Sequence, residues 1–387
     1  MEKIRHVAVN TRFLLKGGLE GIGRYTFEIL NRMVRNHPDV RFSFFFDRPF
    51  DQKFVLSENV KPFVLFPPAR HPVLFRWWLN QSVAGKLRSL KPDVFFSPDG
   101  FLSTKTSVPQ VAVFHDLAFM HYPQDVKPSE AKYYHKWFPA FAEKATRIIA
   151  VSEFTKSDII RQFQTDEEKI TVIHNGCSEN FHPVDDGVKK EVRKKYSAGN
   201  PFFVCVGAIQ PRKNLERIIA AFSLYKKASG SSIKLLLVGR KAWNFGKVIQ
   251  GYQSSPFRDE IIFTGFVTDE ELNAIYSSSL ALCYVPYFEG FGFPVLEATK
   301  AETAVITSMV TSIPEVAGDA ALLVDPMDIN EISRGFSAIA SDQTLRNQLV
   351  EKGKLNTTRF SWNRSAEATW EVLEAAAFRQ IRSPSHK

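Results

Sequence analysis

The feature of this sequence that most constrains its fold is a repeated pattern. A short apolar run is followed by a loop with glycine or proline and then by an amphipathic helical stretch. The runs are rich in Val, Ile, Leu and Phe and do not alternate with polar residues, which is typical of parallel strands covered on both faces. Strands that alternate with helices predict an α/β fold. Strands are predicted at 6–10, 42–46, 94–97, 111–114, 147–151 and 169–173 in the first half, and at 202–207, 234–239, 261–266, 280–286, 304–308 and 321–324 in the second.

The two sets of strands predict two doubly wound parallel-sheet domains, and a length of 387 residues suits two domains of ordinary size. The N-terminal domain is expected to span residues 1–180 and the second domain residues 201–362. Residues 181–200 contain prolines, glycines and a run of cations, and are predicted to be the linker. Ligands of open parallel sheets bind beyond the carboxyl ends of the strands, so we expect the chemistry in a cleft between the domains.

The composition narrows the possible partners and the compartment. A net charge of +9 favours polyanionic partners, but no nucleic-acid-binding motif is present, so nucleic acid is not predicted. Cys177, Cys205 and Cys283 are far apart and form no CxxC pair, which argues against a disulfide framework and favours a reducing cytoplasm. No apolar run approaches the roughly 18–20 residues that a membrane-spanning helix needs.

The first candidate site follows the first strand of the second half. Gly207 ends this strand, Pro211 is expected to begin a turn, and Asn214 is expected to cap the next helix. Arg212 and Lys213 stand just before that helix, where their charges add to the free amides and dipole of a helix N-terminus. The combination predicts a phosphate site. The alternative is two solvated cations on an exposed loop.

The second candidate site follows the fourth strand of the second half and reads EGFGFPVLEA. Gly290 and Gly292 allow the backbone to approach a ligand closely, and Pro294 suits the first turn of a helix. Glu297 is expected in that first turn, where its charge suits the helix dipole and its oxygens can accept bonds from sugar or ribose hydroxyls. Glu289 is expected at the mouth of the loop. The alternative is a Glu297 that only stabilises the dipole and a solvated Glu289.

The first half offers a glycine-rich loop and a histidine. The loop with Gly21 and Gly23 is not a GxGxxG motif, because Thr26 takes the place of the third glycine. It is expected to bring backbone close to a polar ligand, with a flexible surface loop as the alternative. His115 follows a strand and could donate a hydrogen bond to a sugar hydroxyl, oriented by Asp116, or it could be structural. The chain has no Asp-x-Asp triplet, so no metal site is predicted and the two cations of the second half are expected to neutralise any diphosphate.

One amphipathic stretch, residues 70–90, remains. It places Phe75, Trp77 and Trp78 beside two arginines. Aromatic residues interleaved with cations are typical of a surface that contacts an anionic membrane. A buried core helix explains the same pattern equally well.

Together these motifs resemble, in order and spacing, those of the glycosyltransferase family 4 enzymes. The resemblance spans nearly the whole chain and rests on the glycine-rich loop, His115-Asp116, the segment 151–156, His174-Asn175-Gly176, Pro211-Arg212-Lys213-Asn214 and Glu289-x7-Glu297. It implies the GT-B fold, with two Rossmann-like domains facing a deep cleft and the segment 363–387 crossing back to the N-terminal domain. It also implies transfer of a sugar from a nucleotide diphosphate donor, with retention of anomeric configuration and without a metal.

The resemblance also assigns roles. It implies that Arg212 and Lys213 clamp the donor diphosphate. It implies that Glu289 contacts hydroxyls of the transferred sugar and that Glu297 binds the ribose. On this interpretation, Glu289→Ala is expected to leave the affinity for the bare nucleotide almost unchanged. Further donor contacts are implied for Gly207, Gly239, Arg240, Gly265, Phe266, Val267, Gly290, Phe291 and Gly292, and contacts to sugar, phosphate or acceptor for Gly21, Gly23 and His115.

The sequence therefore predicts a cytoplasmic retaining hexosyltransferase, peripheral to the inner face of the cell membrane, that uses a nucleotide sugar and no cofactor. Likeness to bacterial polysaccharide mannosyltransferases predicts GDP-mannose as the donor and a glycan or lipid-linked saccharide as the acceptor. The alternatives are a nucleotide-sugar epimerase or phosphorylase of the same fold, and a catalytically degenerate sugar-binding partner. A nicotinamide oxidoreductase is disfavoured, because neither half has GxGxxG with a downstream acid.

Overall fold

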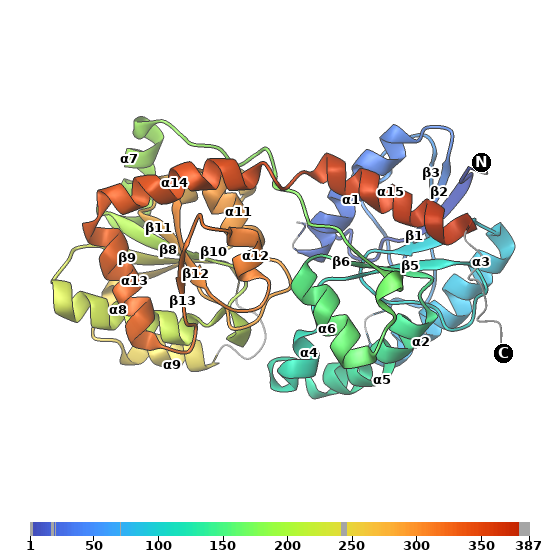
Figure 1. Cartoon of the computed structure of the whole chain (residues 1–387), viewed down its shortest axis with the longest axis horizontal. Coiled ribbons are helices and arrows are strands. Elements are labelled where there is room, and N and C mark those ends of the chain that lie inside the picture. Colours follow the sequence, from blue (N-terminus) through green and yellow to red (C-terminus); the bar gives the residue numbers. More distant parts are fainter. Residues whose placement is uncertain (1–2, 17–18, 20, 70, 241–245, 379–387) are drawn as a thin grey trace. The chain divides into compact units, whose positions relative to one another are not determined.

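The computed structural model in Figure 1 describes residues 3–16, 19, 21–69, 71–240 and 246–378. The chain divides into two compact units. Unit 1 comprises Met1–His121, Pro128–Gly176 and Trp362–Lys387. Unit 2 comprises Tyr122–Lys127 and Cys177–Ser361. Within the described residues, no helix is both long and apolar enough to cross a membrane.

Among the described residues of unit 1, seven strands form one parallel sheet in the order β3-β2-β1-β4-β5-β6-β7. The strands are β1 (His6–Asn10), β2 (Arg41–Phe46), β3 (Val60–Val64), β4 (Val94–Ser97), β5 (Gln110–Phe114), β6 (Arg147–Ala150) and β7 (Ile170–Val172). Six of them were predicted, and β3 is additional. The apolar character of these strands is explained by their burial, since Phe44, Phe95 and Phe114 are each no more than 1% exposed.

The helices of unit 1 cover this sheet (Figure 1). They are α1 (Ile22–Asn36), α2 (Pro72–Trp77), the π-helical turn η2 (Trp78–Val83), α3 (Ala84–Leu90), α4 (Ala118–His121), α5 (Pro128–Lys144), α6 (Glu153–Phe163) and α15 (Trp362–Phe378). The C-terminal helix α15 lies beside α1, where the Trp370 ring stacks on His37 with the centroids 3.6 Å apart. Its first turn is joined to the segment that follows β7, because Ser365 Oγ donates a hydrogen bond to the carbonyl of His174 over 2.6 Å.

Among the described residues of unit 2, six strands form a second parallel sheet in the order β10-β9-β8-β11-β12-β13. The strands are β8 (Phe202–Val206), β9 (Lys234–Val238), β10 (Ile261–Gly265), β11 (Ala281–Tyr284), β12 (Ala304–Ser308) and β13 (Leu322–Val324). All six were predicted. The helices are α7 (Asp186–Ser197), α8 (Leu215–Ser229), α9 (Gly246–Ser254), α10 (Asp269–Ser278), α11 (Phe293–Lys300), α12 (Ile313–Ala317), α13 (Ile329–Ser341) and α14 (Gln343–Thr357).

The pattern of strands in the sequence does not predict the structure of one segment of unit 2 or the membership of another in this unit. The stretch 181–200, expected as a linker, contains helix α7, which packs against α10. Asp185 caps this helix, since its side chain accepts a hydrogen bond from the Val188 amide over 3.0 Å. The short turn η3 (Pro123–Asp125), from the first half of the sequence, also belongs to unit 2, where Tyr122 packs on Tyr287 with ring centroids 4.7 Å apart.

Candidate active site

The strand order of unit 2 reverses between β8 and β11. From β8 the chain moves outward through β9 to β10, and it then returns to place β11 on the other side of β8. The loops that leave the carboxyl ends of β8 and β11 therefore diverge, and open parallel sheets bind ligands at such a point. The two loops are the two candidate sites of the second half, so the topology brings together what the sequence separates by more than 70 residues.

The loop after β8 leads through a short turn, η5 (Pro211–Lys213), into α8. Pro211 begins this turn as predicted. Asn214 stands at the N-cap position of α8 as predicted, but its side chain makes no capping hydrogen bond. Its backbone is left-handed, with φ of 63°, and its amide nitrogen donates instead to the carbonyls of Val285 and Pro326, over 3.0 and 2.7 Å. Asn214 therefore fastens the loop to the segments that follow β11 and β13.

Both predicted phosphate-binding cations lie against Glu289. The Arg212 guanidinium and the Lys213 ammonium each approach the same carboxylate oxygen, Oε1, to 2.6 Å. Backbone bonds join the two loops as well, since the Tyr287 amide donates to the Arg212 carbonyl over 3.2 Å. The alternative of two solvated cations on an exposed loop is therefore excluded for this site, and Glu289 is a buried member of the cluster with 7% of its surface exposed.

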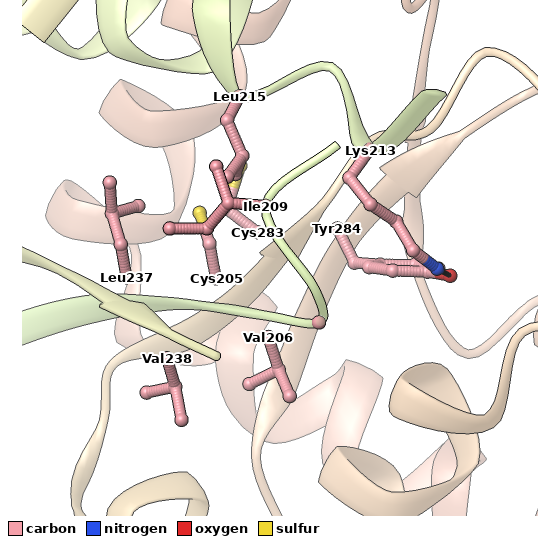
Figure 2. A pocket seen from close by; sticks show the side chains of 10 residues that line it. Cys205, Val206, Ile209, Lys213, Leu215, Leu237, Val238, Cys283 and Tyr284 are labelled. Carbon is pink, nitrogen blue, oxygen red and sulfur yellow. Dashed lines mark hydrogen bonds between the residues drawn. The ribbon is translucent and has the colours of Figure 1, made fainter. Parts of the chain in front are cut away.

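Lys213 has a second partner that the sequence did not indicate. Its ammonium donates to the Tyr284 hydroxyl over 2.7 Å, and Figure 2 shows the two side-chain ends converging from η5 and from the end of β11. The Lys213 stem passes close to Gly207, where an added Cβ would lie 3.4 Å from Lys213 Cε. Gly207 has φ of 133°, so it gives the stem room in a conformation that other residues rarely adopt.

Burial and the charges within the cluster shift the pKa values of Glu289 and Tyr284. Burial raises the pKa of Glu289, but the charges of Arg212 and Lys213 act in the opposite direction and prevail, lowering this pKa to about 2. The carboxylate is therefore ionised at neutral pH. Burial, followed by the charge of Glu289, raises the pKa of Tyr284 well above its usual range, so the phenol stays protonated.

A small cavity of about 10 Å³ lies beneath the cluster. Its walls include Lys213 and Tyr284 on one side and the apolar side chains of Ile209, Leu215 and Leu237 on the other (Figure 2). This space suits at most a single water molecule. The cavity is therefore a packing feature beneath the charged cluster and not a substrate pocket.

The loop from Glu289 to Gly292 is fixed by hydrogen bonds from the segment after β12. Ser312 Oγ donates to the carbonyls of Glu289 and Phe291, over 2.8 and 3.1 Å, and Thr311 Oγ1 accepts from the Glu289 amide over 3.3 Å. Phe291 is 4% exposed, and its ring packs on Phe293 and Phe360. No motif in the sequence indicated Thr311 or Ser312.

The helix α11 begins at Phe293, with Pro294 in its first turn as predicted. Gly292 precedes it with φ of 119°, and an added Cβ there would lie 2.8 Å from Ile313 Cδ1. The prediction that Glu297 lies in the first turn is wrong, because it is the fifth residue of the helix. It is half-buried, and its Oε2 accepts a hydrogen bond from the Tyr276 hydroxyl over 3.1 Å.

The remaining donor residues predicted in unit 2 lie at the carboxyl ends of β9 and β10. Gly239 packs against Gly207 so closely that an added Cβ would lie 2.1 Å from its carbonyl oxygen. The Gly239 amide donates to the carbonyl of Gly265 over 2.9 Å, so the predicted glycines of three neighbouring strands adjoin one another. The other residues here are Arg240, which is exposed, Phe266, which is 62% exposed, and Val267, which is half-buried.

The predicted residues of the first half belong to unit 1. Gly21 precedes α1, and Gly23 packs against backbone, since an added Cβ would lie 2.7 Å from the Phe13 carbonyl oxygen. His115 follows β5, and its Nε2 donates to the Pro98 carbonyl over 2.7 Å. Burial lowers the pKa of His115, which favours the neutral ring.

The stretch 70–90 divides between core and surface. Trp78 is fully buried, and its Nε1 donates to the Leu65 carbonyl over 2.9 Å, so the core interpretation holds for this residue. Trp77 is 50% exposed. The side chains that we call the α2 surface are large, apolar and between 44% and 77% exposed: Val64, Phe66, Val73, Leu74 and Trp77.

The segment that carries most of the α2 surface is rich in cations. Lys86 Nζ lies 4.0 Å from the ring centroid of Phe63, next to Val64, and the Arg76 guanidinium lies 4.1 Å from the Trp137 ring. Between positions 59 and 92 the sequence contains no Asp or Glu. It has these Lys and Arg residues: Lys61, Arg70, Arg76, Lys86, Arg88 and Lys91.

Comparison with known proteins adds two family matches and several relatives. Residues 19–181 match the family described as Glycosyltransferase Family 4, and residues 188–356 match the family described as Glycosyl transferases group 1. The O-antigen chain mannosyltransferase B of Escherichia coli is 28% identical over 366 residues, which cover 92% of this chain and 96% of that protein.

Solved structures share the architecture. Sucrose-phosphate synthase from Thermosynechococcus elongatus has a TM-score of 0.76 at 17% identity, over 96% of this chain and 98% of that one. HepE of Anabaena, solved in complex with UDP and glucose, has a TM-score of 0.75 at 15% identity, over 96% and 100%. At such identities the likeness shows the fold alone, and the predicted GT-B class with two Rossmann-like parallel-sheet domains is confirmed.

Proposed function

The chain belongs to the glycosyltransferases, as its sequence predicted, and from this premise we propose that it transfers mannose from a nucleotide diphosphate sugar to a saccharide acceptor in the synthesis of a surface polysaccharide. A relative that matches 92% of this chain supports the choice of mannose, because it is named an O-antigen chain mannosyltransferase. The donor proposed is GDP-mannose, and the acceptor a glycan or lipid-linked saccharide.

The observation that carries the proposal is the cluster of Arg212, Lys213 and Glu289 at the point where the strand order of unit 2 reverses. Transfer of a glycosyl group leaves a diphosphate that gains negative charge as the bond to the sugar breaks. Two cations in a largely buried site stabilise that charge more than they would in water. We propose that Arg212 and Lys213 bind the diphosphate, and that retention follows from departure and attack on the same face of the sugar.

The other donor contacts are proposed from the resemblance. Glu289 would accept hydrogen bonds from hydroxyls of the transferred sugar, and Glu297 from the ribose. Gly265, Phe266 and Val267, at the carboxyl end of β10, would contact the base. The roles implied for the remaining glycines, Arg240 and Phe291, and for Gly21, Gly23 and His115 toward sugar, phosphate or acceptor, stay predictions.

The α2 surface supports a proposal about location, namely peripheral attachment to the inner face of an anionic membrane. Exposed apolar and aromatic side chains insert at the boundary of headgroups and acyl chains, while neighbouring cations attract anionic lipids. The absence of acids between positions 59 and 92 leaves this attraction unopposed within the segment. Cys177, Cys205 and Cys283 are free, buried thiols, which supports a reducing compartment.

A transfer assay tests the reaction. The protein is incubated with GDP-mannose, UDP-glucose or ADP-glucose, each with and without a mannose-terminated oligosaccharide, and the products are identified by mass spectrometry and NMR. We expect nucleotide release and an α-linked mannosyl product only with GDP-mannose and the acceptor. Conversion of a donor without acceptor would indicate an epimerase instead, and a β-linked product would contradict retention.

A further inference from the structure

Glu289 occupies an unusual position for a residue assigned only to a sugar. Its Oε1 is the shared partner of Arg212 and Lys213, at 2.6 Å from each. Any anion that binds to Arg212 and Lys213 therefore comes close to the Glu289 carboxylate, which the same two cations hold. The repulsion between the anion and this carboxylate is strong, because Glu289 is 7% exposed and water screens the charges little.

The main chain of Glu289 cannot move away to relieve this repulsion. Its carbonyl accepts from Ser312 and its amide donates to Thr311, over 2.8 and 3.3 Å. The flanking Phe288 and Phe291 are 3% and 4% exposed. A bound anion must therefore compete with the side-chain carboxylate for the cations or turn it within a fixed loop.

Protonation of Glu289 does not remove the conflict at neutral pH, because its two cationic partners hold its pKa at about 2 despite burial. A carboxylate turned away from the cations needs new hydrogen-bond donors, since a buried charge without partners is costly. The hydroxyls of a sugar attached to the diphosphate can supply such donors. A bare nucleoside diphosphate has no group that can do so at this position.

We propose that Glu289 makes the site prefer a nucleoside diphosphate sugar over the bare nucleoside diphosphate, by competing with the diphosphate for Arg212 and Lys213 unless sugar hydroxyls hold its carboxylate. This inference rests on the proposed function and deepens it. It revises the expectation that removing Glu289 leaves nucleotide affinity unchanged. It also gives Glu289 a part in product release, because cleavage of the sugar restores the competition.

Calorimetric titration tests the proposal with GDP, UDP and inorganic pyrophosphate as probes, in parallel with GDP-mannose and UDP-glucose. In Glu289→Gln, which keeps the shape and removes the charge, we expect about tenfold tighter binding of the three bare anions. We expect no gain for the nucleotide sugars, so the preference for sugar over bare nucleotide falls. Glu289→Asp keeps the charge and should not show the tighter binding of bare anions.

Glu297→Gln is the matched control, since it removes the charge of a second carboxylate, one that accepts a hydrogen bond from the Tyr276 hydroxyl. It should not tighten the binding of pyrophosphate. Unchanged or weaker binding of bare anions by folded Glu289→Gln, with folding checked by circular dichroism, would overturn the proposal. Failure of the proposed function would be seen differently. The wild type would then transfer no sugar from any of the donors, although the anion affinities of Glu289→Gln change as expected.

Discussion

The ammonium of Lys213 donates a hydrogen bond to the hydroxyl of Tyr284, with the two atoms 2.7 Å apart and the tyrosine 2% exposed. A buried hydrogen bond to a charged group contributes more than one between neutral groups. We therefore predict that Tyr284→Phe lowers the free energy of unfolding by about 1–2 kcal/mol. Urea denaturation measures this loss. In a Lys213→Met background the same substitution should cost much less, and equal costs in both backgrounds would show that the bond contributes nothing.

Lys213 itself should matter for both binding and turnover. Lys213→Ala removes one charge from the proposed diphosphate site, which on this proposal binds its ligand in the ground state and more strongly in the transition state. We expect weaker binding of the nucleotide diphosphate and a fall in kcat/KM of about 10²–10³-fold. Calorimetry and steady-state kinetics measure the two effects. Lys227→Ala, an exposed cation on α8, is the control and should leave both unchanged.

Turnover should not depend on a divalent metal. The sequence has no Asp-x-Asp triplet, and the proposed diphosphate site is made of two cations. We expect the transfer rate to persist in excess EDTA. A strict requirement for added Mg²⁺ or Mn²⁺ would contradict the assignment of Arg212 and Lys213 as the charges that neutralise the diphosphate.

Membrane attachment should depend on the exposed Trp77 and not on the buried Trp78. We expect the double variant Phe66→Ala and Trp77→Ala to lose binding to vesicles of anionic phospholipid and to keep its thermal midpoint. Leu355→Ala, which removes a 75% exposed side chain of unit 2, is the control and should bind as the wild type does. Trp78→Ala should lower the free energy of unfolding by about 3–5 kcal/mol, because that ring is buried. Failure of the wild type to bind such vesicles at low salt would remove the proposal.

Two glycines of unit 1 should respond oppositely to the same substitution. An added Cβ at Gly176 would lie 2.2 Å from the backbone nitrogen of Trp362, so Gly176→Ala should lower the free energy of unfolding by about 2–3 kcal/mol. At Gly85, within α3, an added Cβ would meet nothing within 4 Å, and alanine should stabilise by about 0.5–1 kcal/mol. Chemical denaturation of both variants tests the pair. A stable Gly176→Ala would mean that α15 can shift at little cost.

The strands were predictable because burial on both faces leaves an apolar run that is easy to recognise. The exception is β3, whose Pro62 suggests a break. Its position at the edge of the sheet explains why proline is tolerated there, since one side of an edge strand needs no partner. The sequence did not indicate that Asp185 caps helix α7, because an aspartate close to a glycine suggests a turn as readily as a helix start.

The site was predictable in its residue types but not in its contacts. The sequence indicates that Arg212, Lys213, Glu289 and Glu297 follow strands, and strand ends in a parallel sheet meet at one edge. Which of the two glutamates faces the cations depends on where α11 begins, and Glu297 falls one turn later than expected. Tyr284 could have been found, since it ends the strand before Glu289. Thr311 and Ser312 could not, because they act through tertiary contacts alone.

Unit 1 is assembled from three separate stretches of chain, and the last of them, with α15, comes after every residue of unit 2. A ribosome therefore delivers all of unit 2 before it delivers the helix that completes unit 1. Until then, Tyr25 and Phe42 lack the tryptophans of α15 that pack against them in the finished molecule. The usual order, in which the N-terminal domain matures first during synthesis, is thus reversed for the final step, and apolar surface of unit 1 stays uncovered until α15 has been made.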